Sequence, residues 1–158
     1  MKNDKTDNHE QLFWEEIDRL FPDMIKAIAS LSKKSYLSIT NLRTGITWWS
    51  ERAMDYFGMK ENYTIRSMEK ANRKIHPDDV ATFKRGFKER VDGKNLDTAW
   101  EYRIQDGDSY NRFNAMARVL YDEQKQPFII IIRYDNYGIS DDVDSVTGCL
   151  LYTSDAAD

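Results

Sequence analysis

The fold of this protein is decided by residues 100–132, whose sequence is WEYRIQDGDSYNRFNAMARVLYDEQKQPFIIII. Apolar side chains occupy every second position over residues 100–104, which is the period of a β-strand with one buried face. Asp106-Gly107 is a typical hairpin turn, and the alternation resumes over residues 113–121. After a polar turn comes Phe128–Ile132, an apolar run short enough to be a strand buried on both faces. The stretch therefore predicts successive antiparallel strands.

Two shorter strands are predicted earlier in the chain, over residues 35–42 and 46–50, joined by a turn in which Gly45 supplies the positive φ of a tight hairpin. Ser50 is a suitable N-cap for a helix that stops at Gly58. Helices are predicted over residues 51–57, 67–74 and 77–91. The order of elements therefore predicts an α+β fold, a five-stranded antiparallel sheet with these helices on one face.

An amphipathic helical segment, residues 1–34, precedes the predicted sheet. From Phe13 to Leu31 apolar residues recur at steps of three and four, and Pro22 should kink this helix or start a second one. Its apolar stripe can pack against its own domain or against a second copy of the chain. The second face of the Phe128–Ile132 strand also needs a cover, which the N-terminal helix or a partner subunit could supply. A homodimer through the N-terminal helix or through the sheet face therefore stays open.

The composition argues against several classes of protein. The chain of 158 residues has room for one domain of ordinary size, and its net charge of −4 argues against a nucleic-acid partner. No apolar run approaches the ~20 residues of a membrane helix and the polar start is not a signal peptide, so we expect a cytoplasmic protein without a membrane partner. One cysteine, Cys149, excludes an internal disulfide and a CxxC metal site, and the 2 histidines are too few to predict a metal centre.

Four short motifs follow one another between the first hairpin and the last strand. They are ITWWSERAMDYFG at 46–58, IHPDD at 75–79, EYRI at 101–104 followed by DG at 106–107, and DEQKQP at 122–127. Together, over roughly residues 35–136, they resemble the PAS sensor family. The last motif departs from the family pattern, in which a glycine stands at the position of Lys125.

The resemblance implies a sensory domain that encloses a ligand cavity between its sheet and its middle helices. By apolar pattern and this analogy, the candidate lining residues are Ile75, Phe83, Phe87, Trp100 and Tyr102. Ordinary core packing is the alternative for each of them, because aromatic residues of this size fill cores routinely. A flavin photoreceptor of this family would need a cysteine in the middle helices, and a haem sensor a histidine in the helix after Pro77. The sequence contains neither, so it identifies no cofactor.

The turn His76-Pro77-Asp78-Asp79 also has a physical explanation that is independent of the family. Pro77 sets φ at the first turn of a helix, and Asp78 and Asp79 lie at the positive end of the helix dipole. His76 can cap or hydrogen-bond this turn. We therefore favour an architectural role for His76 over that of a metal or haem ligand.

A second resemblance begins after the predicted sheet, at Asp144-Ser145-Val146-Thr147-Gly148. This segment resembles the signature that opens a GGDEF diguanylate cyclase domain, with Asp144, Thr147 and Gly148 at its motif positions; a plain acidic tail is the alternative. The resemblance implies a parent enzyme that makes cyclic di-GMP from GTP with Mg²⁺, and an EAL phosphodiesterase domain could follow. The chain itself contains no GGDEF, Walker A, GxGxxG or HExxH motif, so we expect no catalysis from this fragment.

Three functions stay open on the sequence. The leading one is a sensory PAS domain that relays a signal to a C-terminal diguanylate cyclase. The second is a PAS-type interaction or dimerisation module that binds no small molecule. The third, a small α+β enzyme, would need an ionisable group inside the cavity, and the candidate lining residues are apolar or aromatic.

The last residues of the chain, CLLYTSDAAD at 149–158, resemble a translated sequencing adapter. We therefore expect that the gene was cut at the start of its catalytic domain and that Cys149 needs no functional explanation. The expected organisation is an N-terminal helical segment (1–34), a PAS-like sensor domain (35–137), a linker with the start of a truncated GGDEF domain (138–148) and an artefact (149–158).

Overall fold

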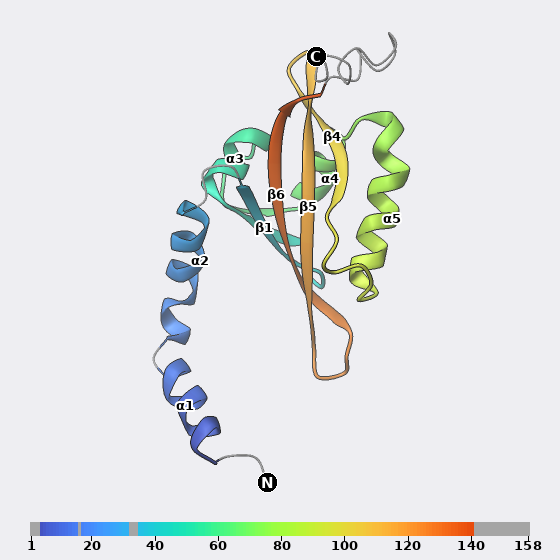
Figure 1. Ribbon diagram of the computed structural model, residues 1–158. Coiled ribbons are helices and arrows are strands. Elements are labelled where there is room, and N and C mark those ends of the chain that lie inside the picture. Colours follow the sequence, from blue (N-terminus) through green and yellow to red (C-terminus); the bar gives the residue numbers. More distant parts are fainter. Residues whose placement is uncertain (1–3, 16, 32–34, 141–158) are drawn as a thin grey trace, which may run out of the picture. The chain divides into compact units, whose positions relative to one another are not determined.

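The computed structural model describes residues 4–15, 17–31 and 35–140, which fall into two compact units that divide between residues 33 and 34 (Figure 1). The expectations about Asp144, Thr147, Gly148 and the last ten residues concern a part of the chain outside this description. Among the described residues, no helix combines the length and the apolar character that crossing a membrane requires.

The first unit is helical. It contains α1 (Asp4–Trp14), a short 3₁₀ turn η1 (Asp18–Leu20) and α2 (Phe21–Ser30). Pro22 lies in the first turn of α2, where its missing N–H and its restricted φ cause no strain, and this confirms the predicted start of a second helix near Pro22. No residue of α2 is buried, and Ile28 and Leu31 are 57% and 83% exposed. Within this unit the apolar stripe predicted from the sequence is therefore not buried.

The second unit is built on a six-stranded antiparallel sheet with the order β3-β2-β1-β6-β5-β4. Its strands are β1 (Ser35–Asn41), β2 (Ile46–Trp49), β3 (Tyr63–Ile65), β4 (Trp100–Asp106), β5 (Ser109–Tyr121) and β6 (Pro127–Ile139). The sequence predicts five of these strands, and the missing one is β3, which pairs with β2 at the edge of the sheet. β3 escapes prediction because 3 residues between polar neighbours are too few to show an alternating pattern.

The helices of this unit are α3 (Glu51–Phe57), α4 (Ser67–Asn72), a 3₁₀ turn η2 (Pro77–Asp79) and α5 (Val80–Val91). Ser50 caps α3 by accepting a hydrogen bond from the N–H of Ala53, and Gly58 ends it at a φ of 71°, both as predicted. α5 begins at Val80 and not at Pro77, because the predicted first turn forms η2. Side chains of α3, α4 and α5 pack into one core with those of the sheet, which confirms the α+β fold with helices on one face.

The helix-covered face of the sheet forms the core. Ser38 of β1 lies opposite Ile132 of β6, and Ile132 lies opposite Ala117 of β5. All three side chains are at most 2% exposed. The small side chains of Ser38 on β1 and Ala117 on β5 leave room for the large side chains that the helices and β4 contribute.

The opposite face, which we call the open face, carries the alternate positions of the same strands. Trp48 of β2, Ile39 of β1, Ile131 of β6 and Arg118 of β5 lie opposite one another across it. Ile131 is only partly buried there, whereas the alternate isoleucines of β6 on the covered face are fully buried. Within this unit the strand at 128–132 is therefore fully buried on one face only, and a cover for its second face stays a prediction. An unbroken apolar run has no period, so it cannot show which face is covered.

Candidate ligand-binding site

The inner face of β4 supplies the first wall of the candidate site. Trp100, Tyr102 and Ile104 alternate with polar residues, so their side chains all point to the helix-covered face, where they are 6%, 2% and 2% exposed. Ala115 of β5 lies opposite Trp100 and gives the indole room. The alternation predicted from the sequence therefore places two candidate residues, Trp100 and Tyr102, deep in the interior.

α5 supplies the opposite wall. Phe83 and Phe87 lie one turn apart on this helix, with their ring centroids at 6.2 Å. Phe83 meets the ring of Tyr102 edge to face at 5.0 Å between centroids. Gly86 lies directly against the indole of Trp100, since a Cβ built on it would be 2.8 Å from Cδ1 of that ring. Only glycine lets α5 come this close to β4.

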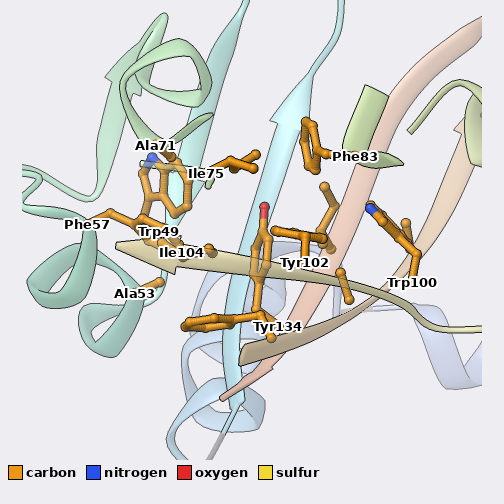
Figure 2. Close-up of a cluster of buried hydrophobic side chains, with 14 of the residues drawn as sticks. Trp49, Ala53, Phe57, Ala71, Ile75, Phe83, Trp100, Tyr102, Ile104 and Tyr134 are labelled. Carbon is orange, nitrogen blue, oxygen red and sulfur yellow. The ribbon is translucent and has the colours of Figure 1, made fainter. Parts of the chain in front are cut away.

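Ile75 reaches the same core from the segment between α4 and η2. It lies opposite Ile104 in an isolated antiparallel bridge and is 6% exposed. Figure 2 shows it in one buried cluster with the candidates Phe83, Trp100 and Tyr102. Phe87 packs against this cluster and is partly buried. The structure thus brings all five candidate residues to one core, an arrangement that both predicted roles, cavity lining and core packing, require.

Three polar atoms in and beside this core have no hydrogen-bond partner among the described residues, the hydroxyl of Tyr102, the indole N–H of Trp100 and Nε of Arg90, which lies over the indole. A buried donor without an acceptor costs about 1–3 kcal/mol. The neighbouring hydroxyl of Tyr134 differs, because it shares a hydrogen bond with Oγ of Ser38 at 3.3 Å. Burial raises the pKa of Tyr134 to about 12 and holds the pKa of Tyr102 well above its ordinary value, so both phenols are protonated donors at neutral pH.

The turn His76-Pro77-Asp78-Asp79 comes directly before α5 and contacts β4 at the edge of this core. Nδ1 of His76 accepts a hydrogen bond from the N–H of Asp78 at 3.1 Å, which confirms the predicted capping role. The imidazole lies on the ring of Tyr110, 4.5 Å between centroids. The carboxylate of Asp79 accepts hydrogen bonds from Nε and Nη2 of Arg103, which lower the pKa of Asp79 below its ordinary value. In the described residues no group of His, Cys, Asp and Glu could hold a metal ion.

This stretch of chain, from the first hairpin to the last strand, matches the family model described as PAS fold over residues 46–132. The chain belongs to the PAS-fold family. The predicted resemblance is therefore confirmed at the level of the family, and the second unit is a PAS domain.

Two solved structures resemble this PAS domain in fold at low sequence identity. One is a sensory box histidine kinase/response regulator from Burkholderia thailandensis, 17% identical, with a TM-score of 0.56 over 85% of this chain and 95% of that chain. The other is the N-terminal domain of a diguanylate cyclase with PAS/PAC sensor from Marinobacter aquaeolei, 15% identical, with a TM-score of 0.54 over 66% of this chain and 96% of that chain. At these identities the likeness shows the fold alone. No curated protein matches the chain.

Arg90 is a buried charge of this PAS domain that the sequence analysis misses. It is 3% exposed, its guanidinium lies over the ring of Trp100 at 4.3 Å from the centroid, and it donates to the carbonyl oxygens of Gly86 and Thr98. A cation over an indole is stabilised by about 0.5–2 kcal/mol. The sequence carries a signal for it, because Phe83, Gly86 and Arg90 recur at steps of three and four on the buried side of α5.

Proposed function

We propose that this PAS domain senses a small molecule in the core between β4 and α5 and regulates a diguanylate cyclase domain that follows it. The observation that carries the proposal is Asp144–Gly148, whose sequence resembles the opening of a GGDEF domain and comes shortly after β6. The Marinobacter structure supports the pairing, because its name joins a PAS/PAC sensor to a diguanylate cyclase. The following domain would bind GTP and Mg²⁺, and this chain would supply the regulation.

β6 offers the route from the core to the following domain. Ile132 and Tyr134 of this strand lie in the core, and the strand continues to Ile139, with a register shift against β5 between Asn136 and Ile139. Directly after it, the N–H of Ser140 donates to the carbonyl of Tyr110 at 2.7 Å, which ties the end of the sheet to β5. A change between two arrangements of the core that moves Tyr134 would therefore be transmitted along β6 to the linker at residues 138–148.

The test uses the product of the natural gene. We expect the full-length protein to convert GTP to cyclic di-GMP with Mg²⁺, and removal of residues 35–140 to change that rate by about fivefold or more, as a coupling free energy near 1 kcal/mol or above requires. A product that makes no cyclic di-GMP, or whose rate is the same without these residues, contradicts the proposal. In the same gene we expect other codons in place of those for CLLYTSDAAD, because these residues are proposed to be of adapter origin.

A second candidate function, dimerisation without a small-molecule ligand, is favoured by the open face. Ile65 on this face is 66% exposed and Leu120 is 53% exposed, and the strands β5 and β6 carry an open groove of about 260 Å³ that is lined in part by Met116 and Ile131. Large apolar patches on a soluble domain mark interaction sites.

The partner that fits the open face is a second copy of this chain. The two arginines that border the groove are matched by carboxylates of their own chain, Arg118 by Asp97 at 2.9 Å and Arg133 by Asp135 at 3.2 Å. Two identical faces can therefore meet without repulsion between like charges. The stripe of α2 is the alternative contact between two copies. Sedimentation of the purified chain tests both, and a strict monomer at high concentration contradicts them.

A further inference from the structure

We propose that β6 ends in a two-position hinge, a β-bulge at Tyr137-Gly138 that sets the face of the sheet from which the chain after Ile139 departs. The inference rests on the proposed regulation of a following domain and adds the element that would transmit the signal. Three observations carry it, namely the bulge, the exposure of the residues beyond it and two asparagines that join it to the core.

The bulge is an extra residue in β6. Phe113 of β5 lies opposite Asn136 of β6. Two positions earlier on β5, Asn111 lies opposite Ile139, so β6 has one residue more than β5 between these pairs. Gly138 has a φ of 88°, and a Cβ built on it would meet no atom of the described residues within 4 Å. Glycine therefore serves the backbone conformation of the bulge and not a close contact.

Closing the bulge would shift the pairing beyond Asn136 by one residue. In the bulged register Ile139 shares a face with its partner Asn111, whereas in a continuous ladder it would lie opposite Tyr110. Successive side chains of a strand point to opposite faces, so a slip of one residue moves Ile139 to the other face of the sheet. The chain after Ile139 would change direction with it.

Burial fixes the register of β6 before the bulge but not beyond it. Ile130 and Ile132 are fully buried on the covered face, and a slip there would bring them to the open face. Tyr137 and Ile139, in contrast, are 63% and 69% exposed. Register is strongly specified where one face of a strand is buried and weakly specified elsewhere. A second register at the end of β6 therefore costs little buried apolar surface and leaves the core pairing intact.

Two asparagines, one on each strand, join the bulge to the core. Oδ1 of Asn136 accepts a hydrogen bond from the N–H of Gly138 at 2.8 Å, and its Nδ2 donates to the hydroxyl of Tyr36 at 3.4 Å. Nδ2 of Asn111 donates to the hydroxyl of Tyr56 at 2.9 Å. The rings of Tyr36 and Tyr56 pack together, 5.4 Å between centroids. A displacement of α3, which carries Tyr56, against β1, which carries Tyr36, would therefore change the hydrogen bonds on both sides of the bulge.

NMR of the purified chain measures the register, because cross-strand nuclear Overhauser effects show which residues face each other. In the major form of the wild type we expect Ile139 to contact Asn111. A minor form, populated to ~1–10% and detected by relaxation dispersion at residues 136–140, should have Ile139 opposite Tyr110.

Gly138→Ala should favour the closed register. A residue with a Cβ is disfavoured at positive φ, so we expect the ratio of closed to bulged register to rise by about 5–30-fold. Gly45→Ala is the matched control, because Gly45 has a φ of 73° and the same free space for a Cβ, but lies in the turn between β1 and β2. It should lower stability and leave the exchange at residues 136–140 unchanged.

Tyr36→Phe tests the connection to the core. It removes the hydroxyl to which Asn136 donates, and it should raise the population of the closed register by about two- to tenfold. Tyr134→Phe is the control, because Tyr134 is the cross-strand partner of Tyr36 and its hydroxyl is paired with Ser38 instead. Asn136→Ala, which releases the N–H of Gly138, replaces Gly138→Ala if that variant does not fold.

The proposal is overturned if Ile139 stays opposite Asn111 in Gly138→Ala and no exchange occurs at residues 136–140. Equal effects of Tyr36→Phe and Tyr134→Phe on this exchange overturn it too. The measurement needs no following domain, so its failure leaves the diguanylate cyclase proposal standing. A natural gene without a cyclase domain would likewise leave the two registers of β6 standing.

Discussion

Asp79 and Arg103 hold the start of α5 against β4 through three hydrogen bonds. Oδ2 of Asp79 accepts from the backbone N–H of Arg103 at 2.8 Å and from its Nε at 2.7 Å, and Oδ1 accepts from Nη2 at 2.8 Å. The N–H of His76 donates to the carbonyl of Arg103 at 2.9 Å. The IHPDD and EYRI motifs, which the sequence analysis treats as separate, are therefore one structural unit that closes the edge of the candidate site.

The first prediction concerns the strength of this contact. Asp79→Asn should lower the free energy of unfolding by about 1–3 kcal/mol, because it removes the charge from a hydrogen-bonded pair whose side chains are only 19% and 20% exposed. Denaturant unfolding at neutral pH measures it. Asp78→Asn, at an 80% exposed side chain of the same turn, is the control and should change stability by no more than about 0.5 kcal/mol. Equal losses in the two variants would contradict the account.

The second prediction is the pH dependence of the same pair. Arg103 holds the pKa of Asp79 below its ordinary value in the folded protein, so folding is favoured by deprotonation of this carboxyl. The contribution of Asp79 to the stability of the fold is therefore complete above its unfolded pKa of ~3.9. It is lost as the pH falls through the lower pKa that Asp79 has in the folded protein. The stability difference between wild type and Asp79→Asn should shrink as the pH falls below about 4. A difference that stays constant from neutral pH to pH ~2 would argue against the pair as its source.

The third prediction concerns Gly86. In an exposed helix, glycine to alanine adds up to about 1 kcal/mol of stability. Gly86→Ala should instead lower stability by about 1–3 kcal/mol, because its Cβ would lie 2.8 Å from Cδ1 of Trp100. Denaturant unfolding shows whether Gly86→Ala is less or more stable than the wild type. In the Trp100→Phe background the loss should become smaller, since a smaller ring faces the new methyl group. A stabilising effect of Gly86→Ala would show that α5 and β4 are not in this contact.

The fourth prediction tests the dimer. Ile65→Lys should weaken self-association of the chain by about tenfold or more without changing its unfolding, because the side chain is 66% exposed in the single chain and would bury a charge at the contact. Sedimentation equilibrium measures the dissociation constant. Ile28→Lys on α2 separates the two proposed contacts. If only Ile28→Lys has an effect, the helix and not the open face joins the two copies.

Much of the fold could be predicted from the sequence because its elements are periodic or capped. β4 and β5 alternate, α3 has Ser50 at its start and Gly58 at its end, and Pro22 opens α2. β3 could not be predicted, since it is held by its pairing with β2 and not by a pattern of its own. The partial exposure of Ile131 could not be predicted either, because it depends on what packs on the open face.

The candidate site could be predicted only as a set of buried side chains. Alternation places Trp100 and Tyr102 inside, and helix spacing places Phe83 opposite them. The unpartnered donors and the burial of Arg90 depend on how α5 packs against β4, which is a tertiary contact. Spacing along the chain contains no information about such a distance.

The central claim is that this PAS domain is the sensory part of a diguanylate cyclase, and the nucleotide sequence of the natural gene beyond the codon for Gly148 tests it most directly. The account predicts that the reading frame continues past this codon and encodes a GGDEF or GGEEF motif within the next domain of ~100–200 residues. A natural frame that encodes residues 149–158 as they stand and then stops would contradict it.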